Sequence, residues 1–217
     1  MITRNSREIA SWLLAQWVKA IVVACNTATA HALPTLRDEL DVPVIGVVEP
    51  GARAAVRASR TGHIGVIATN GTIKSGAYVR AIHAEAPDAR VTALACPLFV
   101  PLVEEGWTEH EATRAIAREY LAPFTSNGVD TLVLGCTHYP LLKPLIAEIV
   151  GPGVRLIDSA EETAADTRRM LAEHSLAAEH GDGSYRFVAS DDQQQFLTLG
   201  QRFFGDTIER VEIKTFG

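Results

Sequence analysis

Short apolar runs alternate along the chain with longer segments in which apolar positions recur every three or four residues. The apolar runs are rich in Val and Ile, which is typical of strands buried on both faces of a parallel sheet. The periodic segments are typical of amphipathic helices. The predicted strands cover residues 20–24, 42–48, 63–68, 91–96, 131–134, 154–157 and 185–189, and residues 208–213 are predicted to form a final strand or an extended tail. The predicted helices cover residues 7–16, 25–40, 53–59, 75–85, 108–124, 141–150, 160–176 and 193–203, and residues 177–184 are predicted to form a loop.

This alternation of strands and helices predicts an α/β fold with a mostly parallel sheet. Ligands of such folds bind at the carboxyl ends of the strands. Two similar stretches lie at such ends: AIVVACNTAT at residues 20–29 and TLVLGCTHYP at residues 131–140. Each is an apolar run, a small residue, a cysteine and then polar residues. The repetition predicts two α/β halves whose cysteine turns face each other across a cleft.

The residue types of the two turns suit proton transfer on a small acidic ligand. A cysteine at a strand-to-helix junction lies near backbone N–H groups and the positive end of a helix dipole, which favours its thiolate. The same N–H groups bind carboxylates. Two thiols that flank one carbon suit the removal of a proton from one face and its return to the other. Polar residues follow each cysteine: Asn26 and Thr27 after Cys25, and Thr137 and His138 after Cys136.

Other interpretations of the cysteines stay open at this level. A cysteine after a buried strand is often only a small buried hydrophobe. Cys25 and Cys136 are also compatible with a redox pair. Zinc is disfavoured, because the chain has no Cys-x-x-Cys or His-x-x-x-His pair. Cys96 has apolar neighbours and is predicted to be a core residue.

Two further residues are candidates for assisting the thiols. His138 stands next to the second cysteine turn. Glu49 ends a predicted strand in VVEPG and is a candidate for orienting a histidine or cysteine, with a cap or turn residue as the competing interpretation. The turn TNGT at residues 69–72 suits either an anion or a helix cap. The other histidines are predicted to be solvated or structural: His31, His63, His83, His110, His174 and His180.

Composition narrows the class of protein. The 217 residues are 47% hydrophobic and 21% charged, which is ordinary for one large or two small globular domains. The net charge is −6 and the basic residues are scattered, so no basic face for nucleic acid is expected. No apolar run reaches the roughly 18–20 residues of a membrane span, and no secretory signal is evident. Three cysteines, an odd count, fit a reducing cytoplasm rather than a disulfide framework.

Six stretches, in this order and spacing, strongly resemble glutamate racemase. The resemblance covers essentially the whole chain, and the two cysteine motifs together are specific. The stretches are VVACNTATA, PVIGVVEPGARAA, GVIATNGTIKSGAY, ACPLFVPLVEEG, LVLGCTHYPLL and LIDSAEETA.

The resemblance implies an enzyme that needs no cofactor or metal and interconverts L- and D-glutamate, supplying D-glutamate for bacterial peptidoglycan. It implies that Cys25 and Cys136 are the paired acid and base, with Cys25 serving D-glutamate and Cys136 serving L-glutamate. By motif match, His138 and Glu49 assist the proton transfers. The substrate-contacting positions implied by the same match are Asn26, Thr27, Thr137 and His138.

The family's architecture is also implied. It has two mostly parallel α/β lobes related by a pseudo-two-fold axis, with the active site in the cleft between them. By this resemblance, residues 1–49 and 158–217 form the first lobe and residues 50–157 form the second. Homodimers, which are common in the family, are expected as well.

The sequence departs from the family pattern at its start. Family members begin with a strand that carries an Asp-Ser-Gly turn, followed by a Pro-Tyr-Gly turn, and neither motif is found here. We therefore expect the first lobe to lack its N-terminal strand and the chain to be a shortened form of a longer product. Trp17 stands where the family has glycine in a left-handed conformation, at a cost of about 1 kcal/mol. A non-catalytic fragment and a racemase of aspartate are the alternatives, although CNTAT and CTHYP match glutamate better.

Overall fold

The computed structural model describes residues 1–178, 181, 183–205 and 208–216. His180 and part of the predicted loop at residues 177–184 lie outside the described residues. The chain divides into two compact units, residues 1–175 and residues 176–217. No helix among the described residues is both long enough and apolar enough to cross a membrane.

The first unit begins with a small α/β layer. Strand β1 (Ile21–Val23) pairs in parallel with β2 (Val44–Gly46). Helices α1 (Ile2–Leu14) and α2 (Asn26–Glu39) bury apolar side chains against these strands. The fully buried positions of this core recur at helical spacing on α2, which is why the sequence folds as a helix there. They include Ala32, Leu33 and Leu36.

A larger parallel sheet follows, with strand order β4-β3-β5-β6. Every residue of β3 (His63–Ala68) and β5 (Thr131–Gly135) is buried, as their continuous apolar runs predict. The outer strands are β4 (Arg90–Ala95) and β6 (Arg155–Ile157). Ala68 pairs with Gly135, so β3 and β5 end side by side, at the edge where the second cysteine turn begins.

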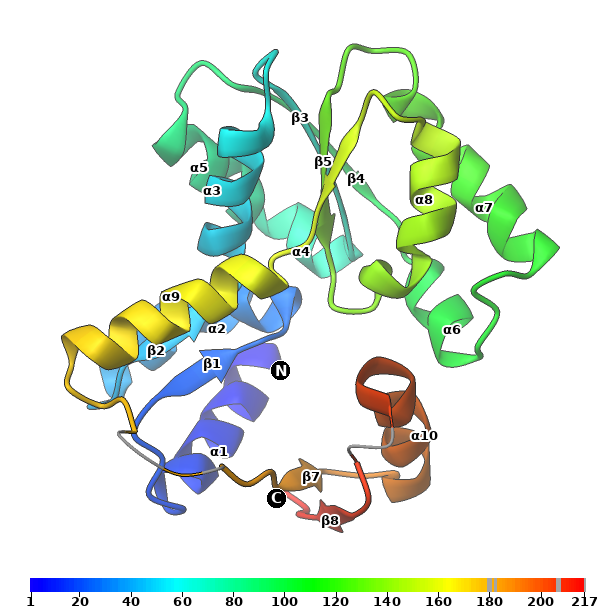
Figure 1. Ribbon diagram of the computed structural model, residues 1–217. Helices are drawn as coiled ribbons and strands as arrows, with labels where there is room; N and C mark the ends of the chain where they lie inside the picture. The colour runs from blue at the N-terminus through cyan, green and yellow to red at the C-terminus, as the bar shows by residue number, and fades with distance from the viewer. Residues whose placement is uncertain (179–180, 182, 206–207, 217) are drawn as a thin grey trace. The chain divides into compact units, whose positions relative to one another are not determined.

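Helices cover both faces of this sheet (Figure 1). On one face lie α3 (Val48–Ala58) and α5 (Ala77–Glu85). On the other lie α6 (Phe99–Glu104), α7 (Glu111–Leu121) and α8 (Lys143–Val150), which pack around the buried rings of Phe99 and Tyr139. Helix α9 (Ala160–Glu173) leaves β6 and packs against α3 and β2. Short helical turns complete the unit: α4 (Asn70–Ser75), η1 (Ala122–Phe124) and η2 (Tyr139–Leu142).

The second unit has its own parallel strand pair. Strand β7 (Phe187–Ala189) pairs with β8 (Val211–Ile213), and α10 (Gln193–Phe204) connects them. Its small core contains Ala189, Ile208 and Val211. The predicted α/β class with parallel sheets is thus confirmed. The assignment of residues 1–49 with 158–217 to one lobe, and of residues 50–157 to another, stays a prediction.

Several predicted boundaries shift for identifiable reasons. Glu49-Pro50-Gly51 was expected to close a strand but forms the first turn of α3, where proline is tolerated because the first N–H groups have no partner within a helix. The helix predicted at residues 75–85 begins at Ala77 in the structure, because Gly76, with a left-handed φ of 67°, separates α5 from α4. Helix α7 starts later than predicted, because the His110 ring caps it by accepting from the Ala112 N–H.

Candidate functional site

The first cysteine turn connects β1 to α2. Cys25 is exposed and is the N-cap of α2, and its Sγ accepts a hydrogen bond from the Ala28 N–H at 3.5 Å. Asn26 and Thr27, the two residues that follow, already belong to the helix. The thiol of Cys25 therefore lies at the positive end of a helix of 14 residues.

The second cysteine turn follows β5. Cys136 is only 8% exposed, and burial is the main reason that its pKa rises to about 11. Negative charge on Cys25 and on Glu104 raises this pKa further, while the backbone N–H groups of His138 and Tyr139 lower it. The sequence led us to expect that the turn favours the thiolate. In the structure, desolvation outweighs the N–H groups.

The two turns meet although they are far apart in sequence. The Thr137 hydroxyl donates to the carbonyl oxygen of Ala24 at 2.8 Å, across 113 positions. This bond joins the residue after Cys136 to the residue before Cys25. The structure thus brings the two predicted cysteine turns together at one place.

His138 connects Cys136 to a carboxylate. Its Nδ1 lies 3.9 Å from Cys136 Sγ, and its Nε2 lies 3.1 Å from Glu104 Oε1. A carboxylate only accepts hydrogen bonds, so Nε2 carries the hydrogen. In the neutral ring Nδ1 is then unprotonated and faces the thiol as an acceptor.

Glu104 is a functional candidate that we missed at the sequence level. It ends α6 within the stretch PLVEEG, where two carboxylates follow an apolar helix directly. The sequence analysis predicted no helix in this stretch, and the stretch does not reveal which residue Glu104 contacts, because Glu104 and His138 are 34 positions apart.

Glu49 does not take the place that we expected. It lies on α3, and its carboxylate forms two hydrogen bonds of 3.1 Å with the Arg37 guanidinium. Arg37 is also the main reason that the pKa of Glu49 is lowered. Glu49 and Arg37 line a separate cavity between α2, α3 and α5. The carboxylate that contacts His138 is therefore Glu104 rather than Glu49.

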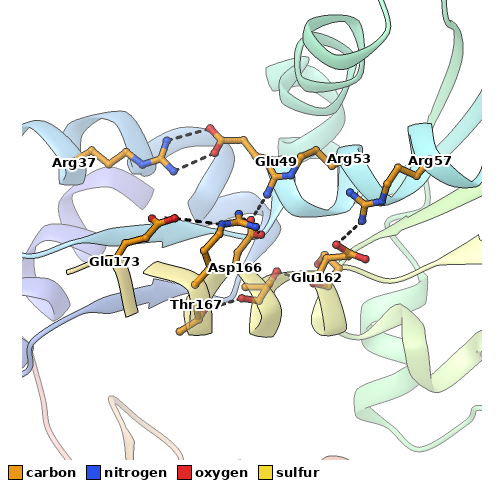
Figure 2. Close-up of polar contacts among 11 residues, drawn as sticks. Arg37, Glu49, Arg53, Arg57, Glu162, Asp166, Thr167 and Glu173 are labelled. Atoms are coloured by element: carbon orange, nitrogen blue, oxygen red, sulfur yellow. Dashed lines mark hydrogen bonds and ion pairs between the residues drawn. The ribbon is translucent and has the colours of Figure 1, made fainter. Parts of the chain in front are cut away.

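Ion pairs connect helices α2, α3 and α9 (Figure 2). Arg53 and Arg57 of α3 pair with Asp166 and Glu162 of α9. Together with the pair between Arg37 and Glu49, they connect α3 to both α2 and α9. Since Asp166 is mostly buried, its pair with Arg53 is screened by solvent less than the others.

Asn26 and Thr27 occupy different surroundings. Asn26 is only 4% exposed and accepts a hydrogen bond from the Tyr78 hydroxyl at 2.7 Å. The Thr27 hydroxyl lies 2.8 Å from that of Thr69 and 3.1 Å from that of Thr72. Thr69 also caps α4, so the predicted TNGT turn is both a helix cap and a neighbour of the first cysteine turn.

A cavity of about 570 Å³ opens at the two turns. Most of its lining is apolar, and it extends along β1 and α9. Its lining includes candidate residues from both turns, namely Asn26, Cys136 and Thr137. Asp158 and Ser159, which precede α9, also line it.

The remaining sequence-level candidates have structural surroundings. Cys96 is fully buried, which raises the pKa of its thiol to about 12 and confirms its prediction as a core residue. His63 is buried, and its Nε2 lies 2.9 Å from the Thr92 hydroxyl. Among the described residues, no three His, Cys, Asp or Glu side chains are grouped so that they could hold a metal ion.

Comparison with known proteins gives one consistent result. Residues 6–167 match the family model described as Asp/Glu/Hydantoin racemase. The chain is 50% identical over 211 residues to the glutamate racemase of Geobacter metallireducens, covering 97% of this chain and 78% of that protein. It is 49% identical to that of Neisseria meningitidis serogroup A, covering 100% of this chain and 80% of that protein.

Solved structures agree with the sequence matches. The crystal structure of a glutamate racemase isoform from Bacillus anthracis superimposes with a TM-score of 0.92 at 36% identity, covering 100% of this chain and 80% of that one. A glutamate racemase from Francisella tularensis, solved in complex with D-glutamate, gives a TM-score of 0.91 at 34% identity. The latter match covers 99% of this chain and 80% of the other.

Proposed function

The chain belongs to the Asp/Glu/Hydantoin racemase family, and on that premise we propose that it interconverts L- and D-glutamate by moving the α-proton between two thiols. The observation that carries the proposal is the meeting of the two cysteine turns. The Thr137–Ala24 hydrogen bond joins them beside a cavity large enough for an amino acid. The similarity to glutamate racemases over nearly the whole chain supports glutamate as the substrate.

The proton balance of the proposed reaction closes on side chains alone. The thiolate of one cysteine removes the hydrogen from Cα, and the electron pair of that bond stays on the substrate, delocalised into its carboxylate. The thiol of the other cysteine donates a proton to the opposite face of Cα. The first cysteine ends as a thiol and the second as a thiolate, ready for the reverse reaction. In this proposal Cys136 serves L-glutamate and Cys25 serves D-glutamate.

The weak acidity of the α-proton is the main barrier, so the carboxylate must be held by donors in a site that excludes water. The N-terminus of α2 provides N–H groups, and Asn26 and Thr27 are the proposed side-chain donors. Thr137, whose hydroxyl hydrogen is donated to the Ala24 carbonyl oxygen, is proposed to contact the substrate as a residue that lines the cavity. His138, held by Glu104, is proposed to accept the proton of Cys136 and return it. Burial of Cys136 makes this help necessary, because burial holds its pKa well above neutrality.

The proposal includes the setting of the reaction. Both proton carriers belong to the chain, so the reaction as proposed requires no cofactor. We propose that the enzyme acts in the cytoplasm and that its D-glutamate is used for peptidoglycan. We also propose that it works as a homodimer.

The deciding experiment incubates the 217-residue chain with L-glutamate in D₂O, with no cofactor added. We expect optical rotation to decay and deuterium to enter Cα mainly in the D-glutamate formed, because the donating thiol exchanges with solvent before it reacts. The Cys96→Ala variant is the matched control, since Cys96 is a buried thiol that the mechanism does not use. It should retain the activity.

Parallel incubations separate the alternatives. Turnover of L-aspartate in preference to L-glutamate would replace the proposed substrate. Loss of rotation with deuterium appearing equally in both enantiomers from the first turnovers would contradict two separate bases. A chain that alters neither amino acid would support the non-catalytic alternative.

A further inference from the structure

A buried hydroxyl lies between the two cysteine turns. Tyr78 belongs to α5 and is only 2% exposed. Its hydroxyl donates to Asn26 Oδ1 at 2.7 Å, across 52 positions of sequence. The Ser159 side chain, just before α9, lies near this hydroxyl, since both lie 3.2 Å from a Cβ built at Gly51. The ring thus lies between the residue after Cys25 and the start of α9.

The chain makes room for this ring with two glycines. A Cβ at Gly135 would lie 3.0 Å from Tyr78 Cε2 and 2.9 Å from the carbonyl oxygen of Ile67. A Cβ at Gly51 would lie 3.2 Å from Tyr78 Oη. Gly135 immediately precedes Cys136, so the tyrosine ring lies against the backbone of the second turn while its hydroxyl contacts the first.

Packing alone does not explain the hydroxyl. A phenylalanine would fill the same space without a polar group to satisfy, and a buried hydroxyl is tolerated only when it is hydrogen-bonded. The Tyr78 hydroxyl donates to Asn26 Oδ1, so the oxygen end of the amide faces the ring and the nitrogen end lies on the other side.

The other end of that amide is available to a ligand. Within the part of the chain that the structure describes, no buried side-chain nitrogen or oxygen lacks a partner, and the Asn26 amide nitrogen makes no hydrogen bond there. The nitrogen is therefore not enclosed by protein. Asn26 lines the cavity beside Cys136, so its N–H groups are available to an anion bound there.

We propose that Tyr78 is a positioning residue, which holds the Asn26 amide with its N–H groups toward the cavity so that they bind the substrate carboxylate next to the α-carbon. The inference rests on the proposed function for the identity of that carboxylate. An amide free to rotate would present its oxygen to the carboxylate for part of the time. The affinity for substrate would fall, because only part of the molecules would present the amide N–H groups and because the amide oxygen repels the carboxylate oxygens.

A double-mutant cycle tests whether Tyr78 acts through Asn26. We expect Tyr78→Phe to lower kcat/KM for L-glutamate about tenfold in the wild-type background. In the Asn26→Ala background the same change should cost less than twofold, because the amide that it orients is gone. Equal losses in both backgrounds would overturn the inference while leaving the racemase function in place.

A matched control removes a comparable buried hydroxyl elsewhere. Thr113 on α7 is fully buried, donates to the Trp107 carbonyl oxygen at 2.6 Å and does not line the cavity. Thr113→Val should lower the melting temperature to an extent similar to Tyr78→Phe but leave kcat/KM within twofold of the wild type. A tenfold loss in this control would mean that kcat/KM reports stability rather than amide orientation, and would overturn the inference.

A second readout does not depend on turnover. The NMR signals of the Asn26 amide can be identified by their loss in Asn26→Ala. In the wild type the nuclear Overhauser contact between these hydrogens and the ring at position 78 should be weaker than in Tyr78→Phe, where the amide rotates and brings its hydrogens closer to the ring. An unchanged or weaker contact in Tyr78→Phe would overturn the inference. If the chain does not racemise glutamate, the proposed function fails, and this measurement still decides the role of Tyr78.

Discussion

The two cysteine turns share a sequence pattern but differ in surroundings. Cys25 is exposed and caps α2, with an N–H group directed at its sulfur. Cys136 is buried, has a pKa raised to about 11, and lies beside a histidine that a carboxylate holds in place. In the proposed mechanism the buried Cys136 therefore needs a neighbouring proton acceptor. Similar local sequences are thus placed in different surroundings by the tertiary structure.

The largest expected effect comes from removing either thiol. Cys25→Ser and Cys136→Ser should each lower racemisation of glutamate by about a thousandfold or more, because a hydroxyl is a far weaker acid than a thiol. The effects should be similar in size despite the different surroundings, since a proton must pass through both residues. Circular dichroism of the reaction measures this. A variant that keeps a tenth of the activity would show that its cysteine is not one of the two proton carriers.

The second prediction uses the burial of Cys136. Its pKa is about 11 in the folded chain against an ordinary value of 9.0, so the unfolded chain ionises first as the pH rises. Its contribution to stability is complete below about pH 9 and is lost as the pH rises toward 11, by about 3 kcal/mol in total. Cys136→Ala should therefore lose about that much less stability than the wild type across this window. Urea unfolding at each pH measures it.

The exposed turn provides the control for that experiment. Cys25→Ala should lose more stability across this window than Cys136→Ala and somewhat less than the wild type, because it keeps the buried Cys136 thiol but removes a charge that raises the pKa of that thiol. If the two alanine variants behave alike, burial does not distinguish the turns.

The third prediction concerns the asymmetry between the turns. Glu104→Gln keeps the shape of the side chain but removes the charge that holds His138, and should lower kcat/KM about tenfold. The loss should be the same for L- and D-glutamate, because the equilibrium constant between the enantiomers is one. The primary deuterium isotope effect should grow only for the enantiomer whose α-proton Cys136 removes. Glu105→Gln, one position along and exposed, should change neither quantity by more than twofold. Equal isotope effects for both enantiomers in Glu104→Gln would mean that Glu104 does not act on Cys136 alone.

The smallest effect concerns the segment that leads to the first turn. Trp17 has a left-handed φ of 62° and is 94% exposed, so it carries strain and buries little apolar surface. Trp17→Gly should raise the free energy of unfolding by about 1 kcal/mol without changing kcat/KM. The control is Ala15→Gly, where φ is −65° and glycine should destabilise instead. Stabilisation by both changes would point to a cause other than backbone strain.

Much of the fold follows from local pattern. The runs HIGVIA and TLVLG predict strands buried on both faces, and every residue of β3 and β5 is buried. The reason is that a parallel sheet covered by helices on both sides has no face exposed to solvent. The left-handed backbone at Trp17 was also predicted, from the resemblance, which implies glycine at this position. The cysteine turns were found because both end apolar runs, and the carboxyl ends of strands are where ligands bind in this fold class.

The sequence by itself therefore determined the α/β class, the parallel strands and the two cysteine turns, because these depend on residues that are neighbours along the chain. Only the tertiary structure decided which side chains contact them. Glu104 rather than Glu49 contacts His138, Thr137 joins the turns through Ala24, and Tyr78 holds Asn26. These partners lie 34, 113 and 52 positions apart, and local spacing carries no information about pairs that only the packing of helices and sheets brings together.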